Sequence, residues 1–128
     1  MIKFRAWDNL LNKMLVVYRI SFDGPVDGVQ VHCYLDDRGA EGSTEYAYDG
    51  DGLILEQFTG LKDVNGNEIY EGDILENRKY RSIVKFANGK FLADVVGTIS
   101  RFDLIGETHG SKVIGNVHDN PELLEADK

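Results

Sequence analysis

The chain contains three histidines, the side chains most often used as ligands for transition metals. His32, His109 and His118 stand far apart in the sequence, and only His118 has a neighbouring carboxylate, Asp119. A zinc site needs three or four converging ligands, so we interpret His118 and Asp119 as a solvated or helix-capping pair. The segment 49–51 lacks the alternating oxygen ligands and the terminal glutamate of a calcium-binding loop. The sequence therefore predicts no metal site.

Covalent catalysis has no better support in the sequence. Cys33 is the only cysteine, so one chain cannot form a disulfide or a cysteine-based metal site. It shares an alternating run with Val29, Val31 and Leu35, which predicts a small buried side chain with an inert thiol. The sequence contains no Gly-x-Ser-x-Gly elbow and no Walker-type phosphate loop. We expect a protein that is not an enzyme and uses no cofactor; an enzyme would need a pocket with converging polar groups.

One basic cluster could contact nucleic acid. The candidate residues are Arg78, Lys79, Tyr80, Arg81, Lys85 and Lys90. Tyr80 and Phe86 could stack on bases. Strand alternation, however, places Tyr80, Ser82 and Val84 on the side opposite Arg81, Ile83 and Lys85, so the charges do not all share one surface. The chain has 14 basic and 22 acidic side chains and a net charge of −8, whereas non-specific DNA binding rests on a positive footprint. Nucleic-acid binding is therefore the less favoured hypothesis.

A turn-rich segment, residues 61–74, is the most informative stretch of the chain. Asn65-Gly66 is the strongest short signal for a tight turn. Gly72 permits a second sharp reversal, and the side chain of Asp73 can bond to neighbouring backbone. These residue types are primarily backbone devices, so the whole segment can be explained by folding alone.

The same segment also allows a functional interpretation. Acidic and aromatic side chains within it could line a binding surface: Asp63, Glu68, Tyr70, Glu71 and Asp73. The candidate interaction surface selected from the sequence consists of Trp7, Tyr70, Glu71 and Asp73.

Alternating apolar and polar residues predict strands in the first half of the chain. A hairpin with a longer loop is expected from residues 2–7 and 14–20, followed by a strand over 29–35. The acidic, glycine-rich stretch 36–52 is expected to be the most mobile, with a short strand at 44–48. A further strand over 53–58 is expected to end at Thr59-Gly60.

The second half of the chain shows the same pattern. Strands are predicted over 74–76, 80–86, 90–96, 98–102 and 112–117, with a hairpin turn at Ala87-Asn88-Gly89. Asn120 as a cap and Pro121 at the first helical position predict a short C-terminal helix whose two leucines pack on the sheet.

The predicted fold is mainly β, with short antiparallel strands forming small barrel-like or sandwich sheets. Residues 70–118 are expected to form an SH3-like barrel. The predicted regions are 1–60 and 61–128, either separate or joined in one compact unit.

Three segments carry a resemblance to a known family. Residues 2–8 with Met14, residues 57–74 and residues 113–124 together resemble the YopX family of bacteriophage and prophage proteins. The resemblance spans nearly the whole chain and is least distinctive in the acidic middle. It implies a small, mainly β protein encoded by a temperate phage or an integrated prophage. It implies no established reaction, cofactor or catalytic residue.

The favoured function is a non-enzymatic protein-interaction module that self-associates. A protein of many short strands has sheet edges that must be paired, covered or charged, and pairing with sister subunits is common. The expected partners are further copies of the chain and an unknown phage or host protein. The N-terminal residues show no apolar leader region, and no run approaches the roughly 20 apolar residues of a membrane helix, so we expect a location in the bacterial cytoplasm and no membrane contact.

Overall fold

The computed structural model describes residues 3–9, 12–21, 29–33, 44–48 and 53–125. The chain divides into two compact units, Met1–Gln57 and Phe58–Lys128. The prediction of a mainly β protein built from short antiparallel strands is confirmed. No helix among the described residues is long and apolar enough to cross a membrane.

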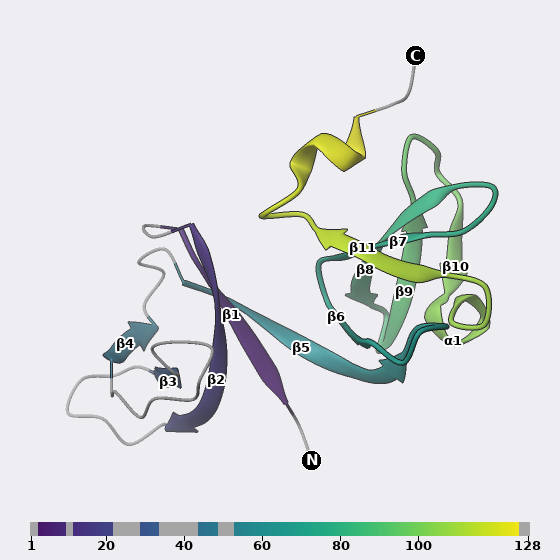
Figure 1. Cartoon of the computed structure of the whole chain (residues 1–128). Helices are drawn as coiled ribbons and strands as arrows, with labels where there is room; N and C mark the ends of the chain where they lie inside the picture. The colour runs from purple at the N-terminus through teal and green to yellow at the C-terminus, as the bar shows by residue number, and fades with distance from the viewer. Residues whose placement is uncertain (1–2, 10–11, 22–28, 34–43, 49–52, 126–128) are drawn as a thin grey trace. The chain divides into compact units, whose positions relative to one another are not determined.

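The first antiparallel sheet has six strands in the order β4-β3-β2-β1-β5-β6. The strands are β1 (Phe4–Asp8), β2 (Lys13–Ser21), β3 (Val29–Cys33), β4 (Thr44–Tyr48), β5 (Leu53–Lys62) and β6 (Glu68–Tyr70) (Figure 1). The boundary between the two units lies within β5, after Gln57. The predicted hairpin of the first two strands is confirmed, with Ala6 opposite Leu15. Ala6, Trp7 and Leu15 of this hairpin are buried, whereas Val16 is 57% exposed.

Two predictions in the N-terminal unit fall largely outside the described residues. The expected mobility of 36–52 concerns residues that are not described, apart from Thr44–Tyr48, which form β4 as predicted. The predicted strand over 29–35 is observed as β3, and its last two residues lie outside the described part.

β5 does not end where the sequence predicted. It continues past Thr59 and Gly60 to Lys62, and its end pairs with β6 (Glu68–Tyr70). Gly60 has a φ of +84°, and the register shifts between Phe58 and Lys62. A glycine with positive φ produces a bulge within the strand here, because pairing with β6 resumes beyond it.

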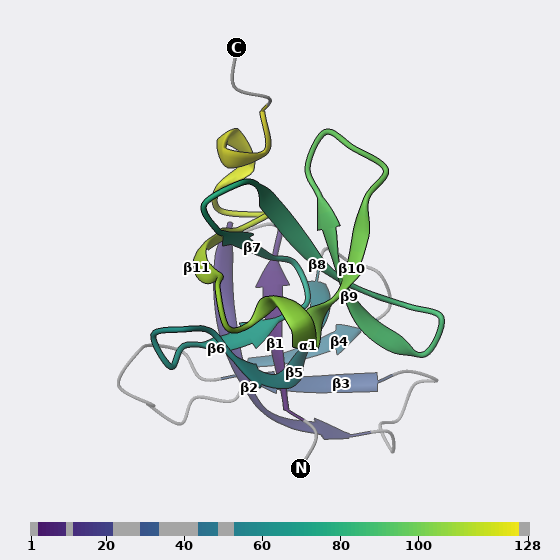
Figure 2. The same ribbon diagram turned by 90° about the vertical axis from the view of Figure 1, so that its right-hand side faces the viewer.

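The C-terminal unit contains a second antiparallel sheet, with the order β10-β9-β8-β7-β11. Its strands are β7 (Asp73–Glu76), β8 (Arg81–Ala87), β9 (Lys90–Val95), β10 (Arg101–Asp103) and β11 (Lys112–Asn116). The predicted β8–β9 hairpin is confirmed, and Asn88 and Gly89 form its turn with φ values of 55° and 80°. Both residues tolerate the left-handed conformation that this turn requires. In Figure 2 the turn projects away from β7 and β11.

The core of the C-terminal unit comes from elements spread along its sequence. The buried cluster consists of Ile69, Leu75, Val84, Ala93 and Leu104, with Leu61, Phe91 and Val113 packed against it. Leu104 belongs to α1 (Leu104–Glu107), a single helical turn that the sequence did not predict. One buried leucine therefore anchors this turn to the sheet.

The predicted C-terminal helix is a single 3-10 turn, η1 (Pro121–Leu124). Pro121 begins it as predicted, but Asn120 makes no capping hydrogen bond. Its side-chain oxygen instead accepts a hydrogen bond from the backbone N–H of Asn116, at 3.3 Å. Asn120 therefore bonds back to β11 instead of capping the turn that follows it.

Candidate functional site

Asp63 organises the Asn-Gly turn of the signature segment. Its Oδ1 accepts hydrogen bonds from the backbone N–H groups of Asn65 and Asn67, at 2.9 and 2.8 Å. Its Oδ2 accepts from the backbone N–H of Val113 at 2.9 Å and from the side chain of Asn67 at 3.3 Å. Gly66, at the centre of the turn, has a φ of +81°. The carboxylate thus shapes the turn and ties it to β11.

The environment of Asp63 favours its charged form. The side chain is only 6% exposed, and burial alone would raise its pKa. The backbone hydrogen bonds from Val113, Asn67 and Asn65 outweigh burial and hold the pKa of Asp63 below its ordinary value. Both carboxylate oxygens accept hydrogen bonds within the chain, so folding alone is enough to explain Asp63.

Asp73 has a similar local role at the second turn. It is 2% exposed, and its Oδ2 accepts a hydrogen bond from the backbone N–H of Tyr70 at 2.8 Å. Gly72 adopts a φ of +83° between them. Tyr70 is half-buried, with its ring centroid 5.5 Å from that of Phe58, and Glu71 is also half-buried. Asp73 therefore offers no exposed side chain to a partner.

Trp7, the remaining member of the predicted interaction surface, is also buried. It belongs to β1 of the N-terminal unit and is 4% exposed. Its indole N–H donates a hydrogen bond to the side chain of Asn9 at 2.8 Å. Burial removes Trp7 and Asp73 from the predicted surface, which leaves Tyr70 and Glu71 partly accessible.

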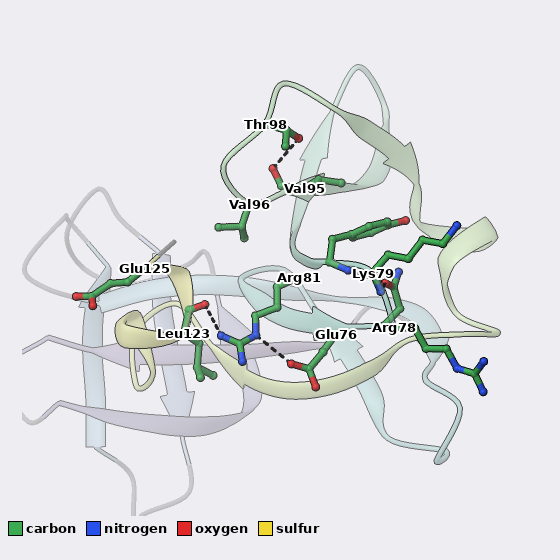
Figure 3. A pocket seen from close by; sticks show the side chains of 11 residues that line it. Glu76, Arg78, Lys79, Arg81, Val95, Val96, Thr98, Leu123 and Glu125 are labelled. Carbon is green, nitrogen blue, oxygen red and sulfur yellow. Dashed lines mark hydrogen bonds and ion pairs between the residues drawn. The ribbon is translucent and has the colours of Figure 1, made fainter. Parts of the chain in front are cut away.

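The basic cluster borders a groove of about 450 Å³ in the C-terminal unit. The groove is lined by Glu76, Asn77, Arg78, Lys79, Tyr80, Arg81, Val95, Val96, Thr98, Leu123 and Glu125 (Figure 3). The Nε of Arg81 contacts Oε2 of Glu76 at 3.0 Å, and an Nη donates to the backbone oxygen of Leu123 at 3.1 Å. Arg81 therefore connects β7 and β8 to η1. In Figure 3 the side chain of Arg78 extends away from these groups.

The structure pairs two of the four remaining cations of the cluster with carboxylates. Lys85 lies 3.2 Å from Asp94, and Lys90 lies 2.8 Å from Asp103. Asp94 also contacts Arg101 at 2.6 Å. Burial alone would raise the pKa of Asp94, but hydrogen bonds from Arg101 and Lys85 lower it. Within the described residues, Arg78 and Lys79 are the cations of the cluster that form no ion pair.

Both the ring and the hydroxyl of Tyr80 contact other residues of the C-terminal unit. The ring stacks on Phe102 with centroids 5.8 Å apart, and the hydroxyl donates to a carboxylate oxygen of Glu107. This hydrogen bond, with burial, raises the pKa of Tyr80 above its ordinary value. The predicted strand alternation is confirmed, because Ser82 and Val84 are buried whereas Lys85 is exposed. The basic cluster is therefore a set of local contacts and not one positive face.

The sequence did not identify an exposed apolar surface in the C-terminal unit. A small hollow of about 200 Å³ is lined by Leu61, Lys90, Phe91, Asp103, Leu104 and Ile105. Ile105 on α1 is 67% exposed at this hollow. Phe91 makes an edge-to-face contact with Phe86, which is 51% exposed, with centroids 4.9 Å apart. We call the set Leu61, Phe86, Phe91 and Ile105 the apolar surface; Leu104 of the core lies beneath it.

The sequence contains no pattern that predicts this apolar surface. It suggests Phe86 only as a base-stacking residue and gives no role to Ile105. The two residues belong to different elements, β8 and α1, and alternation within one strand cannot show that such elements meet. The unpredicted helical turn α1 is what places Ile105 beside Phe91.

No group of three or more histidine, cysteine or carboxylate side chains is arranged to hold a metal among the residues that the structure describes. His109 is exposed, and His118 is half-buried, with its backbone N–H donating to Asn116 at 3.0 Å. The side chains of His32 and Cys33 lie outside the described part.

Comparison with known proteins identifies relatives over almost the full length of the chain. Protein EF1440 from Enterococcus faecalis has a crystal structure similar to this one, with a TM-score of 0.63 and 28% identity over 98% of this chain and 99% of that chain. The crystal structure of protein yopX from Bacillus subtilis has a TM-score of 0.59 and 21% identity, covering 98% of this chain and 97% of that chain, and it shows the same fold. No curated protein matches the chain.

The family model of the YopX protein matches residues 3–125, which include all three segments that carried the resemblance apart from Ile2. The chain therefore belongs to the YopX family.

Proposed function

We propose that this YopX-family chain is a non-enzymatic protein-interaction module that self-associates. The observation that carries the proposal is the apolar surface. Ile105 is 67% exposed at an apolar hollow, and Phe86, which is 51% exposed, packs against Phe91 of that hollow. Exposed apolar side chains that gather around a hollow are typical of protein-binding surfaces, whereas single exposed residues are common and need no explanation. Aromatic residues are also enriched at interface centres.

The proposal extends to the setting and to the fold of the C-terminal unit. Membership of the YopX family supports a phage- or prophage-encoded protein that acts in the bacterial cytoplasm. An SH3-like barrel is supported by the path of the chain, in which β7, β8, β9 and β10 follow one another and β11 returns to pair with β7. A short helical turn, α1, precedes β11. Such a fold serves many functions, so the apolar surface and not the fold carries the proposal.

Nucleic-acid binding has less support from the geometry. Arg81, Lys85 and Lys90 each face a carboxylate, which neutralises the charge that would attract phosphate. Tyr80 stacks on Phe102, so one face of its ring is covered. Arg78 and Lys79 alone form a small positive footprint for a chain of net charge −8.

Sedimentation velocity of the purified chain, from low micromolar to near-millimolar concentration, tests self-association. We expect the weight-average sedimentation coefficient to rise with concentration, because association by mass action buries the apolar surface. A strictly monomeric protein at the highest concentration would overturn the proposal.

Electrophoretic mobility shifts with single- and double-stranded DNA at low salt are expected to show no retardation. Retardation that is lost in the double variant Arg78→Ala, Lys79→Ala would instead support the nucleic-acid hypothesis.

A further inference from the structure

The geometry points to the apolar surface of the C-terminal unit as the self-association site, with a second copy of the chain docked on it across a two-fold axis. This inference rests on the proposed function and specifies its partner and contacts. It is carried by two observations: a projecting side chain beside a hollow, and an ion pair on the rim of that hollow. The covered edge of β11 removes one alternative route of association.

A projecting side chain and a receiving hollow lie on the same surface. The hollow of about 200 Å³ has Leu104, which is part of the core, and Leu61 among its lining residues. Ile105 stands at the hollow with 67% of its surface exposed. A two-fold interface brings the same surface of both copies together, so it must be complementary to itself. A surface with both a projection and a hollow meets that requirement.

The charged groups on the rim of the hollow can also pair with the same groups of a second copy. Nζ of Lys90 lies 2.8 Å from Oδ1 of Asp103, and the two side chains are 57% and 59% exposed. Both residues line the hollow. A two-fold axis beside this pair places each ammonium group against the carboxylate of the other copy, which gives four alternating charges. A partner with a rim of one sign would repel one of the two groups, whereas a second copy repels neither.

The outer edge of β11 is closed to strand pairing, so this edge is not the route of association. The N–H of Val113 donates to Asp63 and the N–H of Asn116 donates to Asn120. The backbone oxygen of Ser111 accepts from the N–H of Val64 at 3.2 Å. Side chains and backbone of the same chain thus occupy the groups that an added strand would use.

Charge exchange between two variants tests the two-fold contact. We predict that Lys90→Glu and Asp103→Lys each weaken self-association roughly tenfold or more, because each places two like-charge contacts across the axis. An equimolar mixture of the two variants is expected to form heterodimers. In that mixture the introduced glutamate faces the introduced lysine, and the unchanged Asp103 of one variant faces the unchanged Lys90 of the other. The ion pair within each chain is broken in both variants, so a purely intrachain role cannot explain such a rescue. Sedimentation velocity with one variant fluorescently labelled measures the result.

Substitutions of exposed isoleucines test the apolar contact independently of the charged pair. Ile105→Asp is expected to abolish association, because it places a carboxylate at the hollow. Ile99→Asp is the matched control, since Ile99 is a fully exposed isoleucine in the loop after β9 and not part of the apolar surface. Circular dichroism verifies that each variant is folded. The inference is overturned if wild-type protein associates but the mixture forms no heterodimer or Ile105→Asp associates normally; the proposed function then still stands. A monomeric wild-type protein overturns both.

Discussion

Asp63 shows how a single carboxylate can explain a long sequence signature without a ligand. Its two oxygens accept four hydrogen bonds, including one from Val113, fifty residues further along the chain. Three of the donors are backbone N–H groups, those of Asn65, Asn67 and Val113. Folding alone is enough to explain a carboxylate with its acceptor sites filled in this way. At Asp63 the structure therefore favours the interpretation that the signature segment serves folding over the interpretation that it lines a binding surface.

We predict that Asp63→Ala lowers the free energy of unfolding by about 2–4 kcal/mol, because three backbone N–H groups lose their acceptor. Folding lowers the pKa of Asp63, so its contribution is present above the pKa of the unfolded chain and is lost as pH falls through the folded pKa. The stability gap between wild type and variant should therefore shrink on acidification. Urea unfolding followed by far-ultraviolet circular dichroism at neutral and acidic pH measures this gap. A gap that is small at neutral pH, or unchanged by acid, would contradict the prediction.

At the scale of elements, β11 and η1 are joined by a close fit between a glycine and an asparagine. A Cβ atom on Gly115 would lie 2.5 Å from Oδ1 of Asn120. That oxygen accepts the hydrogen bond from the N–H of Asn116. The absence of a side chain at Gly115 therefore lets Asn120 fold back over the edge of β11. The same contact closes that edge to strand addition.

We predict that Gly115→Ala displaces Asn120 and destabilises the protein by about 1 kcal/mol, through loss of the hydrogen bond to Asn116. Faster amide hydrogen exchange at Asn116 is the specific readout. Gly110→Ala is the control, because no atom lies within 4 Å of the Cβ position there. Equal exchange rates at Asn116 in wild type and Gly115→Ala would show that Asn120 does not protect this edge.

At the scale of the whole molecule, the two units can be followed by different signals. The buried cluster of the C-terminal unit draws all its members from residues 61–113. The only tryptophan, Trp7, is buried in the N-terminal unit. Tryptophan fluorescence therefore reports on one unit, whereas far-ultraviolet circular dichroism reports on both.

We predict that Leu104→Ala destabilises the C-terminal unit by about 2–4 kcal/mol, because it removes a fully buried side chain from the core. The circular dichroism transition should then split or shift to lower urea, while the fluorescence midpoint of Trp7 stays unchanged. A common shift of both signals would show that the units unfold as one cooperative structure.

The sequence alone determined most of the strands and the tight turns, although β5 and β10 end at other residues than predicted. Alternation along 80–86 predicted that Ser82 and Val84 share a face away from Lys85, and the structure confirms it. Asn88-Gly89 predicted the hairpin turn because only a few residue types tolerate its backbone conformation. These features depend on neighbours within a few residues, so they can be read without knowing the fold.

The tertiary structure alone decided which side chains are available for binding. Trp7 and Asp73 have the chemistry of an interaction surface, yet both are buried. Ile105 and Phe91 meet at one hollow only because α1 packs beside β9. Asp63 became a structural residue through its bond to the distant Val113. Exposure and long-range contact depend on how separate elements pack together, and no local pattern in the sequence carries that information.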